Sequence, residues 1–190
     1  MKYEEDIYVG YRYYDTFGKS SAVAYPFGYG LSYTTFGYRD LKISSDAFDS
    51  AAGSVTVTVD VYNNGTVAGK EVVQLYLSAP GANKPVQELK AFQKTALLNA
   101  GEHQTLTFTL NSLDLASFDE SSHAWVADPG TYAVRIGSSS AGEKLNKYFQ
   151  LESPMTVKTT NSVLIPVKPL NLLVHPVIAD YAQEALTVAP

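Results

Sequence analysis

The sequence of 190 residues contains no cysteine. Disulfide bridges, thiolate metal sites and a cysteine nucleophile are therefore excluded, although the cellular compartment stays open. Positive charge is also scarce, since 14 lysines and arginines stand against 19 aspartates and glutamates, a net charge of −5. A surface that binds nucleic acid needs an excess of basic side chains, so this balance argues against a nucleic-acid partner.

Membrane spans and catalytic signatures are missing as well. No apolar run reaches the roughly 20 residues that a helix needs to cross a bilayer, so we expect no membrane partner. The histidines, at positions 103, 123 and 175, lie far apart and match no metal-binding or catalytic-triad spacing. The carboxylates at 4–6 and 119–120 are sequence neighbours, whereas a glycosidase needs two that face each other across a pocket. We therefore predict no catalytic residue, no cofactor and no metal ion in this chain.

Strict alternation of apolar and polar residues marks the clearest segment. Ser54–Tyr62 has valine at every second position, and this period of two predicts a strand with one buried face. Further strands are predicted at 38–44, 71–78, 86–98, 104–110, 123–127, 131–137 and 144–152. Turn residues separate these segments roughly every 8–12 residues without intervening helical patterns, which indicates an all-β protein with a β-sandwich.

The same pattern predicts a crossing point and a core. Asn63-Asn-Gly65 ends the clearest strand, either as a two-residue hairpin turn or as a loop that crosses between two sheets. Trp125, the only tryptophan, is interpreted as a core residue rather than as a platform for sugar stacking. The core members expected from the later strands are Leu89, Phe92, Leu106, Phe108 and Leu110.

Aromatic residues gather near the N-terminus, in a part of the chain that differs from the strands. Ile7–Tyr14 is rich in β-forming residues and is predicted as one strand, which needs a partner strand in this chain or in another domain. Ala24–Phe36 reads AYPFGYGLSYTTF, with large aromatic anchors around a turn of proline and glycine. These aromatics are interpreted as a packing surface for a neighbouring domain, with a carbohydrate groove as the competing interpretation. The candidate interface residues are Tyr8, Tyr11, Tyr13, Tyr25, Phe27, Tyr29 and Tyr33.

The last segment, 153–190, is rich in proline and lacks alternation. Its apolar stretches at 163–165 and 170–174 suit the edge of a sandwich, and 177–186 has weak helical spacing. We expect a tail that is partly docked and partly loose.

Two sets of motifs resemble one family of enzymes. Glu5–Asp15 followed by Ala24–Phe36 resembles the end of the second, α/β-sandwich domain of family 3 glycoside hydrolases, the β-glucosidases and their relatives. Val55–Leu77, followed by Pro85–Phe92 and later by Pro129-Gly-Thr-Tyr132, is similar to their C-terminal fibronectin type III-like domain. The resemblance implies that 1–33 is a remnant and linker of the α/β domain, that 34–152 is an immunoglobulin- or fibronectin type III-like sandwich, and that 153–190 is a C-terminal tail.

The resemblance also sets an expectation about function. Family members carry an aspartate nucleophile on a barrel domain and usually a glutamate acid/base on the α/β domain, and no residue of this chain matches either. It therefore implies a non-catalytic accessory domain that stabilises the catalytic barrel and α/β domains of a parent enzyme, which hydrolyses β-glycosidic bonds and is periplasmic or secreted in a bacterium. In that parent, 84–92 is expected to reach toward the rim of the active site. The alternatives are a carbohydrate-binding module that takes β-glycans, and a structural or adhesive immunoglobulin-like module.

Overall fold

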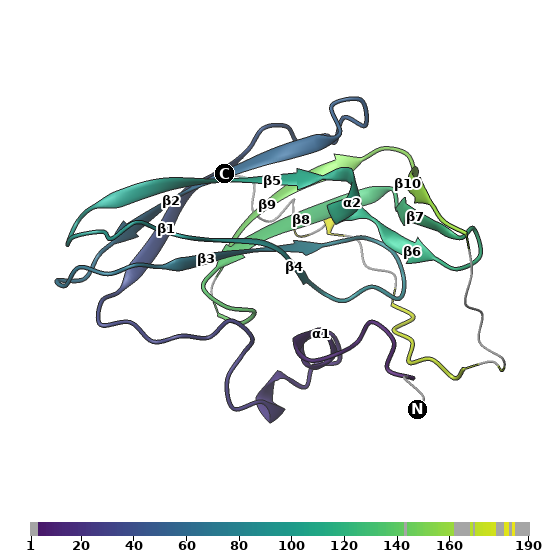
Figure 1. Ribbon diagram of the computed structural model, residues 1–190, viewed down its shortest axis with the longest axis horizontal. Coiled ribbons are helices and arrows are strands. Elements are labelled where there is room, and N and C mark those ends of the chain that lie inside the picture. Colours follow the sequence, from purple (N-terminus) through teal and green to yellow (C-terminus); the bar gives the residue numbers. More distant parts are fainter. Residues whose placement is uncertain are drawn as a thin grey trace.

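The computed structural model describes residues 4–142, 144–161, 168, 170–177, 181, 182 and 184. Its centre is a sandwich of two antiparallel sheets, one with three strands and one with four (Figure 1). The first sheet has the order β1-β2-β5, and its strands are Phe36–Ile43, Ser54–Asn63 and His103–Asn111. The second has the order β4-β3-β8-β9, and its strands are Glu88–Lys94, Val72–Ser78, Gly130–Gly137 and Leu145–Leu151.

A third, smaller sheet extends one end of the sandwich. It has the order β10-β7-β6, with strands Met155–Thr159, Ala124–Ala127 and Ser117–Asp119. Trp125 is half-buried there, packs against the core and meets Phe118 edge to face at 5.7 Å, so it borders the core in which it was expected to lie. Within the described part of the chain, no helix is long and apolar enough to span a bilayer.

The core lies between the two main sheets. The valines of β2 at positions 55, 57, 59 and 61 are almost completely buried, as the alternation predicts. Leu106, Phe108 and Leu110 of β5 join them, and Leu75, Val134 and Ile136 face them from the other sheet. Burial of each such side chain contributes about 1.5–3 kcal/mol relative to exposure, so this apolar layer is the main source of stability.

Asn63 marks the place where the chain crosses from one sheet to the other. The strand before it belongs to the first sheet and β3 belongs to the second, so the crossing loop is confirmed and the hairpin alternative is wrong. The Asn63 side chain is fully buried and donates to the carbonyl oxygens of Val67 and Leu98, at 2.8 and 2.9 Å. Its Oδ1 accepts from the hydroxyl of Thr34 at 2.6 Å and from the backbone N–H of Gly65 at 3.1 Å. One amide therefore joins β2, the crossing loop and the chain that enters β1.

A tyrosine fixes the corner before β8. The hydroxyl of Tyr132 donates to the carbonyl oxygen of Asp128 at 2.8 Å, and its ring stacks on Phe149 at 5.3 Å. A tyrosine whose hydroxyl returns to the backbone a few residues upstream is a hallmark of sandwiches built like immunoglobulin domains. The chain has no cysteine, so the apolar core and this corner stabilise the sandwich without a disulfide.

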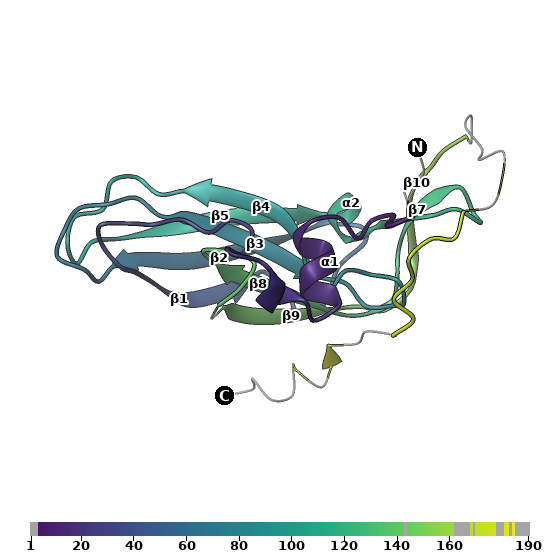
Figure 2. The ribbon, with the colours of Figure 1, turned by 90° about the horizontal axis from the view of Figure 1, so that it is seen from below.

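The predicted strand at Ile7–Tyr14 is wrong. Gly10 has a φ of 60°, which ends any extended segment, and helix α1 follows as Tyr11–Thr16. The backbone N–H groups of Tyr13 and Tyr14 both donate to the carbonyl oxygen of Gly10. The helix lies against the outer face of the four-stranded sheet, as two views at right angles show (Figures 1 and 2). β-Propensity indicated a strand, but no strand pairs with this stretch in the described chain, and contacts with the sheet favour the helix.

The sequence predicted the wrong core residues for β4, namely Leu89 and Phe92. Phe92 is 69% exposed and Leu89 is half-buried, whereas Ala91 packs against the core. A register shift between the pairs Leu75–Ala91 and Tyr76–Leu89 explains Leu89, because it places Leu89 on the outer face opposite Tyr76. Phe92 faces outward because it is the neighbour of the inward Ala91 and pairs with Gln74. Alternation read from the sequence cannot reveal such a bulge.

Four short elements lie outside the predicted ones, and two of them are strand β6 and the 3₁₀ helix η1, Ser20–Ala22. Helix α2, Ser112–Leu115, begins with a capping box in which Asn111 and Asp114 bond to each other's backbone. Strand β10 lies in the segment that we predicted as tail. The apolar stretch at 163–165 lies outside the described residues, as does most of 177–186.

Candidate docking surface

The turn at Pro26–Tyr29 is fixed on the outer face of β3 by a hydrogen bond from the Gln74 side chain to its backbone. The backbone N–H of Tyr29 donates to the carbonyl oxygen of Pro26 at 3.1 Å. Gln74 of β3 donates to the carbonyl oxygens of Gly28 and Ser138, at 3.1 and 2.6 Å. Gly28 has a φ of 80°, and a Cβ there would lie 2.1 Å from Oε1 of Gln74, so only glycine fits.

Two aromatic rings hold helix α1 to the turn and to the sheet. Tyr11 stacks on Phe27 with ring centroids 4.5 Å apart, and it meets Tyr76 of β3 edge to face at 6.1 Å. The hydroxyl of Tyr11 accepts from the backbone N–H of Leu89 at 2.8 Å, and the hydroxyl of Tyr76 donates to Gln74. Burial raises the pKa of Tyr11 and of Tyr76 above the usual tyrosine value of 10.0, so both hydroxyls stay neutral near pH 7.

Polar contacts along β4 complete the attachment of α1. Thr16 Oγ1 accepts from the backbone N–H of Val86 at 3.0 Å, and Asp15 Oδ2 accepts from the side chain of Gln87 at 2.9 Å. Arg12 lies 3.3 Å from Glu88 in an ion pair. The loop between β3 and β4 and the first residues of β4 therefore present their donors and charges to the helix.

The C-terminal segment crosses the same region. The backbone N–H of Leu173 donates to the carbonyl oxygen of Glu4. The backbone N–H of Asn83 donates to the carbonyl oxygen of His175, and Asn83 Oδ1 accepts from the N–H of His175, both at 3.0 Å. The ring of His175 meets Phe17 edge to face at 5.4 Å. Segments from both ends of the chain thus lie side by side near α1, as Figure 2 shows.

The seven candidate interface residues divide into two groups. Tyr8 is 2% exposed and packs on Phe17, while Tyr11 and Tyr13 are half-buried within the chain. The four candidates of the linker are more exposed, at 69% for Tyr25, 45% for Phe27, 49% for Tyr29 and 99% for Tyr33, although Phe27 also stacks on Tyr11.

One exposed apolar residue was missed in the sequence. Leu31 is 90% exposed and lies between Tyr29 and Tyr33, at the same spacing of two residues. That alternation was the signal that could have revealed it. We name the outward side chains of Tyr25, Tyr29, Leu31 and Tyr33 the linker strip.

The linker strip has the chemistry of a docking surface. Tyr25 and Tyr29 hold their rings 5.0 Å apart, and Leu31 and Tyr33 extend the row toward β1. Tyrosines bury a large area at a small cost in side-chain entropy, and they are enriched where proteins meet. The backbone of the turn is already fixed, so a partner would order little more than side chains.

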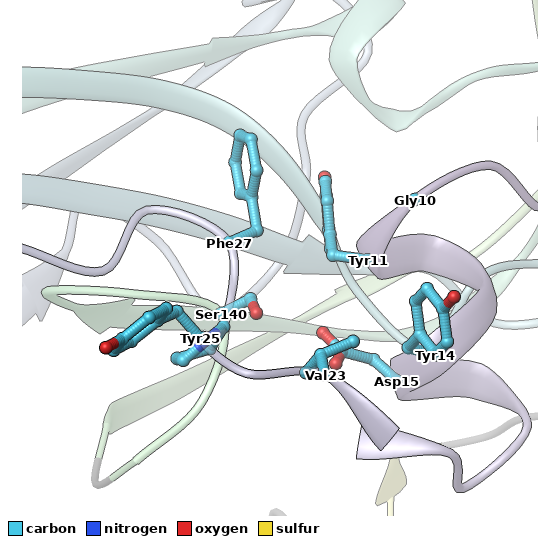
Figure 3. A pocket seen from close by; sticks show the side chains of 9 residues that line it. Gly10, Tyr11, Tyr14, Asp15, Val23, Tyr25, Phe27 and Ser140 are labelled. Atoms are coloured by element: carbon cyan, nitrogen blue, oxygen red, sulfur yellow. The ribbon is translucent and has the colours of Figure 1, made fainter. Parts of the chain in front are cut away.

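A small hollow lies between α1 and the turn (Figure 3). Its volume is about 190 Å³, and its walls include Tyr11, Tyr14, Asp15, Phe27 and Ser140. Small-molecule sites usually measure about 300–1,000 Å³, so this hollow alone is below that range. Among the described residues, no group of three or more His, Asp or Glu side chains converges on a point where a metal ion would bind.

Comparison with known proteins agrees with this architecture. The profile of the fibronectin type III-like domain family matches residues 71–140, which cover β3 to β8. The sandwich of three and four strands, the tyrosine corner and this match define a fibronectin type III-like domain.

The relatives identify the enzymes in which this domain occurs. The chain is 42% identical over 180 residues to a β-glucosidase of Ruminococcus albus, a match that covers 91% of this chain and 18% of that protein. The β-glucosidase 3B of Thermotoga neapolitana, solved with α-D-glucose, superposes with a TM-score of 0.74 and 49% identity over 82% of this chain and 21% of that one. A β-glucosidase of Paenibacillus barengoltzii gives a TM-score of 0.77 and 37% identity over 87% of this chain and 19% of that one.

The resemblance to family 3 glycoside hydrolases is thereby confirmed. The chain corresponds to a fibronectin type III-like part of these β-glucosidases, together with the segments that flank it. It spans about a fifth of the length of the relatives that it matches.

Proposed function

We propose that this chain is a non-catalytic accessory domain that docks on the catalytic domains of a longer β-glucosidase through the linker strip. In this proposal 1–33 is the connection to a preceding α/β domain, 34–152 is the sandwich and 153–190 is a tail. The longer enzyme hydrolyses β-glycosidic bonds, and this part holds its catalytic domains in register.

The observation that carries the proposal is the contrast between backbone and side chains in the linker. The Pro26–Tyr29 turn is fixed through Gly28 and Gln74, yet Leu31 and Tyr33 are 90% and 99% exposed. Large apolar side chains that are exposed together on an ordered segment typically mark an interaction site. Burial of Leu31 and Tyr33 on a partner would contribute about 1.5–3 kcal/mol each.

The test compares one double variant in two contexts. Leu31→Ser with Tyr33→Ser removes apolar area that is solvent-exposed in this chain, so we expect a change in the free energy of unfolding below about 0.5 kcal/mol here. In the complete parent enzyme the same change should cost about 3–5 kcal/mol and should separate the unfolding of this domain from that of the catalytic domains. Differential scanning calorimetry of both proteins measures the two effects.

The control is Leu97→Ser, since Leu97 is 57% exposed between β4 and β5 and lies outside both the linker strip and 84–92. We expect it to be neutral in both contexts. An equal effect of the double variant in both contexts, or none in the parent enzyme, would contradict docking through the strip.

A further inference from the structure

A second hollow, wider and more polar, lies on the other side of Asp15 and Ser140. Both residues also line the aromatic hollow of Figure 3, so the two hollows are neighbours. The second has a volume of about 430 Å³, within the range of small-molecule sites. We name it the polar hollow; the walls used below are Asp15, Gln87, Arg135, Ser140, Lys144 and Asn146.

Charges of both signs face the polar hollow, and the cationic side chains already have partners within the chain. Lys144 Nζ donates to the carbonyl oxygen of Ser140 at 2.6 Å and lies over the ring of Tyr76. Arg135 donates to Ser78 and forms an ion pair of 2.8 Å with Glu184. Burial lowers the pKa of Lys144, the nearby Asp15 raises it and Arg135 lowers it. The attraction of Asp15 thus offsets only part of the cost of removing the Lys144 ammonium group from water.

Two polar atoms at the polar hollow have no hydrogen-bond partner. They are the hydroxyl of Ser140 and the Oδ1 atom of Asn146, both buried. Ser140 is 3% exposed, its N–H donates to Phe27 and its carbonyl oxygen accepts from Gln87 and Lys144. In Figure 3 its hydroxyl points into the space beside Asp15. Buried polar atoms are rarely left unpaired in proteins, so these two indicate a missing partner.

The unpaired atoms and their neighbours select the chemistry of that partner. Asn146 Oδ1 and Asp15 accept hydrogen bonds, whereas Lys144 and Arg135 donate them, so a ligand must do both. Sulfate offers no donor to the two acceptors. Phosphate near pH 7 keeps an O–H donor, but its negative charge is repelled by Asp15, and a metal ion would be repelled by the two cations. Adjacent hydroxyl groups on a sugar ring both donate and accept, and the apolar face of the ring suits Tyr11 and Tyr14 in the adjoining hollow.

We propose that the polar hollow is a binding site for one neutral sugar unit, free or at the end of a glycan. Its hydroxyls would bond Asn146 Oδ1, Asp15 and Ser140 and accept from Lys144. The site uses no residue of the linker strip, so docking of domains and sugar binding succeed or fail separately.

The experiment is a titration of the full chain with glucose and cellobiose, followed by ¹H–¹⁵N NMR spectra. An open site with few contacts predicts a millimolar dissociation constant, with saturable shifts at the amides of Ser140, Lys144 and Asn146. Asn146→Leu should weaken binding about tenfold, because it removes an acceptor and leaves a sugar hydroxyl unpaired. Ser140→Ala, which changes little volume, should weaken it about threefold to tenfold and serves if Asn146→Leu does not fold.

The matched control is Asn64→Leu, an exposed asparagine of the crossing loop, which should leave the titration unchanged. The strip variant Tyr33→Ser should also leave it unchanged. Inorganic phosphate that shifts the same amides more strongly than glucose would overturn the assignment in favour of an anion site. Absence of saturable shifts at the polar hollow would overturn it as well, and so would an affinity that is the same in Ser140→Ala, in Asn146→Leu and in the unchanged chain.

Discussion

Gly28 and Gln74 are in contact in a way that only glycine permits. The Gln74 amide bonds the Gly28 carbonyl oxygen and is itself held by Ser138 and Tyr76, so it cannot swing away from an added methyl group. Gly28→Ala should therefore cost about 1–3 kcal/mol of stability, from strain at positive φ and from displaced hydrogen bonds. Urea unfolding followed by tyrosine fluorescence measures this loss.

Gly30 supplies the matched control for that substitution. It lies two residues further along the same linker, and a Cβ there would meet no atom within 4 Å. We expect Gly30→Ala to change stability by less than about 0.5 kcal/mol. Equal costs for the two variants would contradict the role assigned to Gly28.

The buried amide of Asn63 gives a second prediction. Asn63→Ala removes the partners of Val67, Leu98 and Thr34 at once, and we expect a loss of about 2–4 kcal/mol in the free energy of unfolding. The neighbouring Asn64 is exposed, and Asn64→Ala should be nearly neutral. Chemical denaturation of both variants measures the two changes in the free energy of unfolding. No change for Asn63→Ala would mean that the crossing loop does not depend on this side chain.

A third prediction concerns the C-terminal segment. Asn83 has a φ of 55°, which glycine also adopts, so Asn83→Gly removes the acceptor of the His175 N–H without backbone strain. The amide of His175 should then exchange with solvent about tenfold faster, since one hydrogen bond of about 1 kcal/mol is lost. Native-state hydrogen exchange measures this rate. Amides of β2 in the same spectrum should stay unchanged, and an unchanged His175 would exclude the contact.

A fourth prediction follows from the pKa of Glu71. Burial raises it above the ordinary value of 4.5, although a hydrogen bond from the Val72 N–H lowers it in part. Folding therefore favours the protonated form, and the native state loses stability as the pH rises through the raised pKa. Glu71→Gln should be more stable than the unchanged chain near pH 7. The difference in the free energy of unfolding should vanish below the ordinary glutamate pKa of 4.5.

The urea midpoints of Glu71→Gln and of the unchanged chain, measured at neutral and at acidic pH, test the direction of this stability difference. The control is Glu120→Gln, since Glu120 is exposed, and it should change the free energy of unfolding by less than about 0.5 kcal/mol. A Glu71→Gln variant that is less stable at neutral pH would show that the carboxylate contributes more through its hydrogen bond than its burial costs.

The sandwich could be predicted from the sequence because the patterns that specify its strands and turns lie within short segments of the chain. Alternating valines in β2 and turn residues such as Asp128-Pro-Gly130 fix faces and strand ends without knowledge of partners. The bulge in β4 and the helix at Tyr11–Thr16 could not be predicted, because each depends on contacts with distant residues.

The same reason separates the candidate residues. The sequence identifies the aromatic linker, but Tyr11 and Tyr33 look alike in it, and only the fold shows that one is packed on Phe27 and the other is exposed. The polar hollow could not be predicted, since Asp15, Asn146 and Ser140 come from separate parts of the chain.

Both faces of β3 are covered, one by the β2 sheet and the other by α1 and the linker turn. Gln74 and Tyr76 lie on the outer face and are nearly inaccessible, although a sandwich strand usually shows that face to water. An exchange of this domain between enzymes at the start of β1 would therefore uncover Tyr76 and leave Gln74 without Gly28. A chimera that keeps residues from Ile7 onward with the sandwich should express as a folded protein, whereas one joined at Thr34 should aggregate.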